Sequence, residues 1–381
     1  MRSAGDFFEH RLGDGRQAVQ VHPPLITSSD CEGAGEVFTI SPRSEKALPT
    51  TNGGAYGNGA EKEKQKLFFR EPKYLTVSSQ LHLEAWAAEL GDVWALSPTF
   101  RAEESDTSRH LAEFYMLEGE FRQATSVEQI AQLAENLIRH LTTTLHSHRT
   151  GKELLDLYAD RRHRPADQDS PDLEQRWKRL LPTQPSYLTV TYTDAISELS
   201  SAYSANASTF EISPSWASGF SLEHERWIVQ HIGKGLPTIV THYPKAQKPF
   251  YMLPSSASSV PPAASGNGEG ETVACFDILL PFGYAEVCGG SLREHRLPNL
   301  IDSMREKGLL KTDAEGKSDY PGLREGESLG SLEWYADLRR FGSSPHGGFG
   351  LGFDRLLAYL TGASSVRDVV GFPRWWGRAD C

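Results

Sequence analysis

Short runs of apolar and β-branched residues, each bordered by turn-forming residues, occur at intervals along the chain. Because successive side chains of a strand face opposite sides of a sheet, such runs predict β-strands. The predicted strands are Val19–His22, Tyr74–Val77, Val93–Leu96, His110–Leu117, Tyr187–Tyr192, Pro237–Val240 and Cys275–Leu280.

One long segment has the period of an amphipathic helix instead. Its apolar residues recur every three or four positions and so share one helix face; they are Val127, Ile130, Leu133, Leu137, Leu141 and Leu145. Ser126 and Gln129 match a capping box and predict where this helix begins. A second helix is predicted over Gly352–Tyr359. Strands and helices do not alternate strictly, which favours an α+β fold, a mainly antiparallel sheet flanked by helices, over a doubly wound parallel sheet.

Four polar stretches interrupt these elements. They are rich in Pro, Gly, Ser or charged residues and predict loops or insertions; they lie at about 43–64, 159–186, 255–272 and 311–329.

The composition is that of a globular enzyme. The 381 residues are 38% hydrophobic and 23% charged, and no apolar run approaches the ~20 residues that span a bilayer. No secretory signal is recognisable at the start. The four cysteines are too far apart in sequence to predict a zinc ribbon or a disulfide framework. A net charge of −11 argues against broad basic patches for indiscriminate nucleic-acid binding, but it leaves room for a local basic groove.

The densest block of charged residues is SPTFRAEESDTSRHLAEFYMLEGE, from Ser97 to Glu120. It places Arg101, Glu103, Arg109 and His110 on or beside two strand-like stretches joined by a short polar loop. Residues two apart on a strand share a face, so we expect Arg101 and Glu103 to point the same way. A lone Arg–Glu pair is usually an exposed salt bridge. A block this dense favours a site that holds a polyphosphate with guanidinium groups, and a base with a carboxylate and Phe114.

A second block, Pro345–Arg355, contains four glycines in the six residues 347–352. Glycines allow a ligand to approach the backbone closely, and the helix predicted to follow would present Arg355. No Lys-Ser or Lys-Thr follows at the spacing of a P-loop, and the block lacks the strand–turn–helix setting of a dinucleotide fingerprint.

A third block, Phe276–Glu294, carries carboxylates and one arginine. Asp277 and Glu286 offer the hard oxygen ligands that Mg²⁺ prefers. Arg293 follows a Gly-Gly pair and can address a carbonyl or carboxylate of a small ligand.

Taken together, FRAEESDTSRHLAEFYMLE and GGFGLGFDR resemble the second and third signature motifs of class II aminoacyl-tRNA synthetases. VHPPLIT resembles the end of the first motif, whose proline, here Pro24, lies at the dimer interface of the family. DCEGAGE, LTVSSQLHLE and YADLRRFG are similar to asparaginyl enzymes, and the ending RDVVGFPR and final Cys381, with QLHLE, resemble the bacterial and organellar ones more than the eukaryotic cytosolic ones. The resemblance runs from about Phe7 to Cys381. It implies one class II catalytic domain over 1–381 that activates asparagine with ATP and Mg²⁺ and charges tRNA(Asn), as a homodimer without membrane or DNA partners.

The resemblance also implies roles for individual residues. Arg101 is expected at the α-phosphate of ATP, and Arg355 is expected to stack on the base and reach the γ-phosphate, which makes these two the catalytic candidates. The remaining ATP-binding candidates are Glu103 and Phe114 at the adenine, Arg109 and His110 near the pyrophosphate, and Glu286. Glu286, with Asp277, is the candidate metal ligand. Glu32 and Gln80 are expected at the α-amino side of the amino acid, and Arg293 at its side-chain carbonyl.

Aspartyl enzymes are the main alternative. They carry a lysine three residues after the glutamine that matches Gln80, where this chain has Leu83. Without that lysine, the carboxylate of a bound aspartate would lack one of its cationic partners. Burying an unpaired charge costs free energy, so a neutral amide suits the pocket better.

The start of the chain departs from the family, because no small β-barrel (OB-fold) anticodon-binding domain precedes the first motif. Two alternative interpretations of the chain therefore stay open. It could be a truncated, inactive product, or a paralogue that activates an amino acid without tRNA, like ammonia-dependent asparagine synthetase. The bacterial and organellar character favours the mitochondrial matrix, with the cytoplasm as the alternative.

Overall fold

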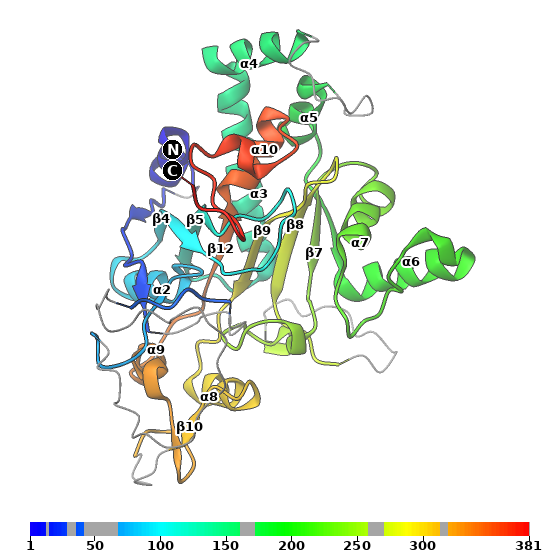
Figure 1. Ribbon diagram of the computed structural model, residues 1–381. Helices are drawn as coiled ribbons and strands as arrows, with labels where there is room; N and C mark the ends of the chain where they lie inside the picture. The colour runs from blue at the N-terminus through cyan, green and yellow to red at the C-terminus, as the bar shows by residue number, and fades with distance from the viewer. Residues whose placement is uncertain are drawn as a thin grey trace, which may run out of the picture.

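The computed structural model describes residues 1–12, 15–28, 36–41, 68–160, 172–257, 270–312 and 319–380. Its centre is an eight-stranded sheet (Figure 1) in the order β1-β4-β5-β12-β9-β8-β7-β6. The strands in that order are Val19–Gln20, Val93–Phe100, Glu113–Arg122, His346–Gly352, Ala285–Leu292, Cys275–Leu280, Thr238–Thr241 and Leu188–Thr191. Only the outer pairs β1–β4 and β6–β7 are parallel. The mainly antiparallel α+β sheet predicted from the sequence is confirmed.

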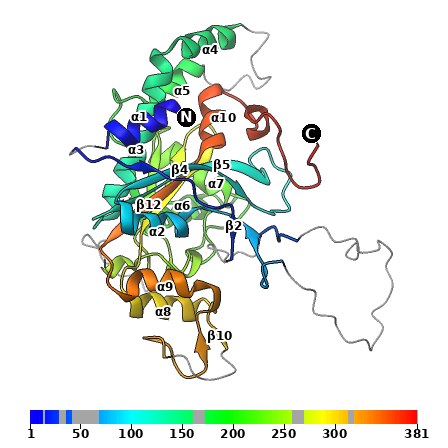
Figure 2. The same cartoon turned by 90° about the vertical axis from the view of Figure 1, so that its left-hand side faces the viewer.

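Helices cover both faces and the two ends of this sheet. They are α1 Arg2–His10, α2 Gln80–Leu90, α3 Val127–Ser147, α4 Arg149–Ala159, α5 Leu173–Leu180, α6 Tyr192–Ala205, α7 Leu222–Trp227, α8 Leu297–Glu306, α9 Glu333–Arg340 and α10 Phe353–Thr361. Figure 2 shows α8 and α9 side by side below the sheet and α3 and α10 above it. None of the helices in the described residues is long and apolar enough to cross a membrane.

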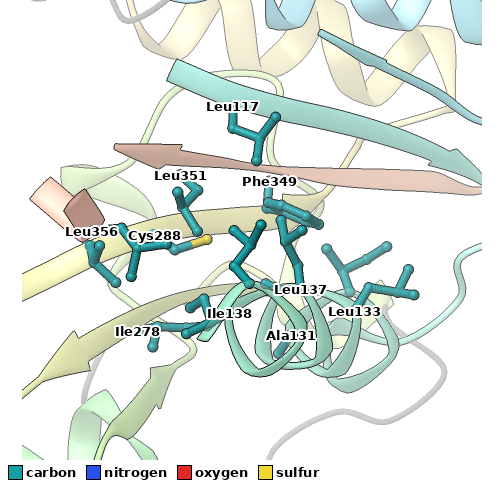
Figure 3. Close-up of a cluster of buried hydrophobic side chains, with 14 of the residues drawn as sticks. Leu117, Ala131, Leu133, Leu137, Ile138, Ile278, Cys288, Phe349, Leu351 and Leu356 are labelled. Atoms are coloured by element: carbon teal, nitrogen blue, oxygen red, sulfur yellow. The ribbon is translucent and has the colours of Figure 1, made fainter. Parts of the chain in front are cut away.

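The main core lies between α3 and one face of the sheet. Leu137 and Ile138 of α3 pack with Leu117, Phe349 and side chains of β8 and β9, all of them buried (Figure 3). Each large apolar side chain buried here contributes roughly 1.5–3 kcal/mol. The predicted helix and its capping box are both confirmed: the Ser126 side chain accepts from the third helical residue, and Gln129 reaches back to the backbone of Ser126. Residues that alternate with the core positions along these strands point to the opposite face.

Several predicted boundaries differ from the structure. The strand expected at His110–Leu117 begins at Glu113 and continues to Arg122 as β5, and the one expected at Tyr74–Val77 is the two-residue β3, Tyr74–Leu75, paired with β2, Ile26–Thr27. Part of the polar stretch 159–186 is helical (α5), and the stretch 311–329 contains the short strands β10, Lys311–Thr312, and β11, Glu327–Ser328. The stretch 43–64 lies outside the described residues.

The glycine-rich block forms a central strand, β12, which was not predicted from the sequence. β12 lies between β5 and β9, where little room is left for side chains. A Cβ on Gly348 would lie 2.2 Å from the carbonyl oxygen of Gly119, so only glycine allows the strands to pair so closely at this position.

Candidate active site

Two adjoining cavities lie on the face of the sheet opposite α3. The wide cavity, about 530 Å³, is bordered by Gln80, Glu120 and Arg293, and the narrow cavity, about 90 Å³, by Glu103, Phe114 and Arg355. Four residues line both cavities and join them into one cleft: Arg101, Met116, Glu286 and Gly350. A cleft with a wide and a narrow end can hold two ligands or two parts of one.

All seven residues predicted to bind ATP line the narrow cavity: Arg101, Glu103, Arg109, His110, Phe114, Glu286 and Arg355. They come from the segment between β4 and β5 and from β5, β9 and α10. The fold therefore gathers residues that are as much as 254 positions apart in sequence, the difference between 101 and 355. Their guanidinium groups, carboxylates and one aromatic ring are the chemistry expected for a nucleoside polyphosphate.

The base-side residues of the narrow cavity are held by one another. Glu103 lies 3.8 Å from Arg101 and 3.1 Å from His110, and the guanidinium of Arg101 lies 5.5 Å from the centre of the Phe114 ring. Arg101 and Glu103 do point the same way, but not because they share a strand. β4 ends at Phe100, and the following backbone is fixed by the Arg101 N–H donating to Ala112.

The other end of the narrow cavity is strongly cationic. Arg355 and Arg109 both donate to the carbonyl oxygen of Glu286, at 3.1 and 3.5 Å, and Arg355 lies 3.8 Å from its carboxylate. Burial lowers the pKa of Arg109, and the charge of Arg355 lowers it further. Burial alone would raise the pKa of Glu286, but Arg355, Lys248 and the other nearby cations hold it below its ordinary value. Glu286 is therefore an ionised carboxylate among arginines.

Two carboxylates converge over Gly289 in the wall of the wide cavity. A Cβ on Gly289 would lie 2.9 Å from Oδ1 of Asp277 and 3.5 Å from Oε1 of Glu286. Asp277 also accepts from Lys248 at 2.9 Å, and burial raises the pKa of Asp277 while Lys248 opposes that rise. On α7, burial and the charge of Glu286 raise the pKa of Glu225 to about 7.

The residues predicted to bind the amino acid fall in the wide cavity where they can be placed. Gln80 and Arg293 line it, whereas Glu32 lies outside the described residues. Arg293 is almost fully buried and forms a two-point ion pair with Glu120, with its Nε 3.1 Å from Oε1 and its Nη2 2.9 Å from Oε2. Leu83, 1% exposed, lines the same cavity.

A buried ionic network behind the wide cavity was not predicted from the sequence. Glu84 of α2 accepts from Arg339 and Tyr335 of α9 and from Gln80, and it lies 3.1 Å from Nε2 of His346. Burial opposes ionisation, but the charge of Arg339 and the contact with His346 hold the pKa of Glu84 well below its ordinary value. Glu84, Glu120 and His346 are close enough to ligate a metal. However, the two arginines Arg339 and Arg293 already neutralise both carboxylates, and a divalent cation would add uncompensated charge.

Most of the chain is similar to known proteins of one family. Residues 14–376 match the model of the family described as tRNA synthetases class II (D, K and N). The chain belongs to the class II aminoacyl-tRNA synthetases. It is 38% identical over 372 residues to the asparagine–tRNA ligase of Legionella pneumophila (strain Lens), an alignment that covers 97% of this chain and 68% of that protein. It is 40% identical over 365 residues to the asparagine–tRNA ligase of Yersinia enterocolitica, covering 96% of this chain and 67% of that one.

Among solved structures, this class II synthetase is similar to the asparaginyl-tRNA synthetase of Pyrococcus horikoshii complexed with asparaginyl-adenylate. The TM-score is 0.69 at 28% identity, and the match covers 99% of this chain and 67% of that one. The class II catalytic fold expected from the sequence motifs is thereby confirmed.

Proposed function

We propose that this class II synthetase activates asparagine with ATP, forming asparaginyl-adenylate and pyrophosphate, and then transfers the asparaginyl group to tRNA(Asn). The observation that carries the choice of amino acid is Leu83, a buried apolar residue in the wall of the wide cavity, which the Arg293–Glu120 pair also lines. The names of the relatives and the asparaginyl-adenylate in the Pyrococcus horikoshii structure support it. We take residues 1–381 as one catalytic domain, which the match over 14–376 supports.

The wide cavity is chemically suited to a side-chain amide. Arg293 offers N–H donors to a carbonyl oxygen, and Glu120 offers an acceptor to an amide N–H₂ group. Leu83 brings no cation, so a carboxylate of aspartate bound at Arg293 would have to share that guanidinium with Glu120. Removing a carboxylate from water without its own cation is costly, and the amide is favoured. Gln80 and, from the resemblance, Glu32 are proposed to bind the α-amino group.

The narrow cavity is suited to ATP. Arg101 is proposed to bind the α-phosphate, because it lies where the two cavities join. Arg109, His110 and Arg355 are then placed toward the β- and γ-phosphates, and Glu103 and Phe114 toward the base. Guanidinium groups fixed by their neighbours before the substrate arrives need not reorganise during the reaction, which is the main source of stabilisation in phosphoryl transfer.

The reaction needs no nucleophile from the protein. A carboxylate oxygen of asparagine forms a bond to the α-phosphorus, the bond from that phosphorus to the bridging oxygen breaks, and pyrophosphate leaves with the electron pair. A terminal ribose hydroxyl of tRNA then forms an ester at the carbonyl carbon, and AMP leaves. The residues act by holding the two reactants together and by stabilising charge on the phosphate oxygens.

The carboxylates over Gly289 fit a divalent cation. Asp277 and Glu286 present oxygens on the same side of one Cα atom, and hard oxygens from one or two carboxylates plus phosphates are the usual set for Mg²⁺. We propose that Glu286, with Asp277, holds Mg²⁺ on the phosphates of ATP. Bound there, the cation would neutralise phosphate charge.

A homodimer is proposed on the N-terminal side of the sheet. Four large apolar side chains of β1, β2 and α2 are about half exposed, and burying them against a second copy would be favourable; they are Val19, Ile26, Trp86 and Leu90. The mass of the purified chain in solution tests the proposed homodimer.

The mitochondrial matrix is proposed as the compartment, because the chain is similar to bacterial enzymes. Finding the full-length protein only in the cytosol would overturn this proposal.

Amino-acid-dependent ATP–pyrophosphate exchange tests the proposed activity. Exchange with asparagine but not with aspartate is expected, and charging of tRNA(Asn) in a second assay separates a synthetase from an enzyme that activates asparagine without tRNA. Exchange with aspartate alone would assign the aspartyl activity instead. Absence of exchange with either amino acid would mean that the chain at this length is not a working enzyme.

A further inference from the structure

The loop that carries most of the ATP-binding candidates is in contact with the end of the chain. This ATP loop, residues 101–112, joins β4 to β5. It carries four of the seven residues proposed to bind ATP: Arg101, Glu103, Arg109 and His110. The C-terminal segment, residues 365–378, follows α10 and is drawn in red in Figure 2. No role proposed above for ATP, asparagine or Mg²⁺ uses a residue of the C-terminal segment.

Backbone hydrogen bonds join the two segments at two places. In the middle of the ATP loop, the carbonyl oxygen of Ser108 accepts from the N–H of Val366 at 2.9 Å. At the end of the loop, the N–H of Ala112 donates to the carbonyl oxygen of Arg374 at 2.7 Å. The side chain of Val366 also belongs to one buried apolar cluster with Leu111. The C-terminal segment therefore fixes the course of the second half of the ATP loop.

Arg367 adds a side-chain link to the same loop. Its Nη2 donates to the carboxylate of Asp106 at 2.8 Å and to the carbonyl oxygen of Thr107 at 3.0 Å. Its guanidinium lies over the ring of Trp375, 4.3 Å from the ring centre, and its side chain is 20% exposed. A guanidinium that lies on a ring and donates to two acceptors is held in one orientation, which a lone exposed ion pair is not.

The part of the loop that Arg367 holds also orients two of the proposed ATP contacts. Nδ1 of His110 lies within hydrogen-bonding distance of the hydroxyls of Thr107 and Ser105, and Nε2 of His110 lies 3.1 Å from the carboxylate of Glu103. Arg367 itself does not line the narrow cavity. A shift of Thr107 would release His110 and, through it, Glu103, so Arg367 is connected to the narrow cavity through the loop.

We propose that Arg367 is a positioning residue for ATP, which holds the ATP loop in the conformation that directs Glu103 and His110 into the narrow cavity. The proposal rests on the proposed function for the use of ATP. Without this link the loop would populate other conformations, and the apparent Kd for ATP would rise in inverse proportion to the fraction of competent loops. Of the ATP loop, Arg101 alone lines the wide cavity, so the affinity for asparagine should change little.

Arg367→Gln tests the proposal, because it removes the charge and the contact with the ring. In ATP–pyrophosphate exchange by the purified full chain, the KM for ATP should rise roughly three- to tenfold, the range for losing one such hydrogen-bonded contact. The KM for asparagine and the kcat at saturating ATP should stay within about twofold, since neither the amino-acid site nor the reacting groups are altered. A wild-type KM for ATP in Arg367→Gln would overturn the positioning role.

Asp106 allows the same link to be cut from the other side. Its side chain is 64% exposed, so Asp106→Asn leaves the core intact and should raise the KM for ATP less than Arg367→Gln does, because the bond to Thr107 is kept. The double variant should match Arg367→Gln alone, since both changes remove one pair. Effects that multiply in the double variant would overturn the link that the proposal requires. Arg378→Gln is the matched control: its guanidinium lies over the same Trp375 ring, at 5.2 Å, and it should behave as the wild type.

Deuterium uptake by backbone amides separates positioning from a general loss of stability. In Arg367→Gln, the peptide that contains the ATP loop should take up deuterium at least about threefold faster, while peptides of α3 should match the wild type. Faster uptake in both regions would mean that Arg367 stabilises the whole fold, and it would overturn the positioning role. A wild type without asparagine-dependent exchange would defeat the proposed function. Equilibrium dialysis of radiolabelled ATP would then still decide the role of Arg367, and equal affinities of variant and wild type would overturn it.

Discussion

The guanidinium of Arg293 and the carboxylate of Glu120 meet directly above the Cα of Gly348. Arg293 follows β9 and Glu120 belongs to β5, and β12, which carries Gly348, lies between these strands. A Cβ on Gly348 would lie 2.2 Å from Oε2 of Glu120 and 2.9 Å from Nη2 of Arg293. The glycine run of β12 is thus what allows a buried ion pair to lie flat against the sheet in the wide cavity.

Gly348→Ala is therefore expected to damage the amino-acid site. The added methyl group would displace the ion pair and press on the carbonyl oxygen of Gly119, so the KM for asparagine should rise at least tenfold and the free energy of unfolding should fall by about 1–3 kcal/mol. Exchange kinetics and urea unfolding measure the two effects. Gly371→Ala is the control, because nothing lies within 4 Å of a Cβ at that position. A Gly348→Ala protein with wild-type kinetics and stability would contradict the packing described for β12.

The buried ionic network around Glu84 gives a second prediction. Glu84→Gln would leave Arg339 buried without its counter-charge, and breaking a buried ion pair on one side costs about 3–5 kcal/mol. Urea unfolding should show most of that loss. Glu89→Gln, an exposed position on the same helix, should change stability by less than about 0.5 kcal/mol. Equal stability of the two variants would mean that the network is not what secures α2 against α9.

The sequence predicted what local patterns determine. α3 was identified together with its capping box, because a long run of helical periodicity depends on neighbouring residues alone. The ATP-binding candidates could also be picked out from the sequence, because the motifs that carry them are short and contiguous, and all of these candidates line one cavity. The strand β12 was missed, because its glycines have no intrinsic preference for a strand. Its conformation is determined by β5 and β9 on either side.

Contacts between distant segments could not be read from the sequence. Glu84 and Arg339 are separated by 255 positions, and neither is unusual in its local context. Lys248 lies in a loop between prolines, and its pairing with Asp277 appears only when that loop folds back onto β8.

The choice of amino acid gives a third prediction. Leu83→Lys would place an ammonium group in the wall of the cavity that Arg293 also lines, and the kcat/KM for asparagine should fall at least tenfold because a neutral amide cannot compensate a further buried cation. Leu83→Met keeps the volume and the neutrality of the site and should stay within about threefold of the wild type. Exchange with asparagine and aspartate measures both. Unchanged asparagine affinity in Leu83→Lys would mean that the side-chain pocket has been misplaced.

Arg101 is predicted to be the most sensitive position for chemistry. Arg101→Ala should lower the rate of exchange by about 10²–10³, the scale for removing one preorganised charge from a developing oxyanion, while the thermal unfolding midpoint changes little. Arg378→Ala removes an exposed arginine near the end of the chain and should leave the rate unchanged. Near-normal exchange by Arg101→Ala would take away the central role assigned to it.

The carboxyl group of Glu225 gives a prediction about pH. Burial, followed by the charge of Glu286, raises its pKa from 4.5 to about 7 in the folded protein. Between those two pH values the folded chain keeps a proton on Glu225 that the unfolded chain releases. The contribution of Glu225 to the free energy of unfolding therefore falls as pH rises, and this contribution is lost above pH 7.

The variant Glu225→Gln has no such titration, so its free energy of unfolding relative to that of the wild type should increase by roughly 2 kcal/mol from pH 5 to pH 8. Urea unfolding at both pH values, without Mg²⁺ or phosphate, is the measurement. The exposed variant Glu198→Gln should follow the wild-type curve. Parallel curves for Glu225→Gln and the wild type would show that Glu225 titrates as an ordinary carboxyl group.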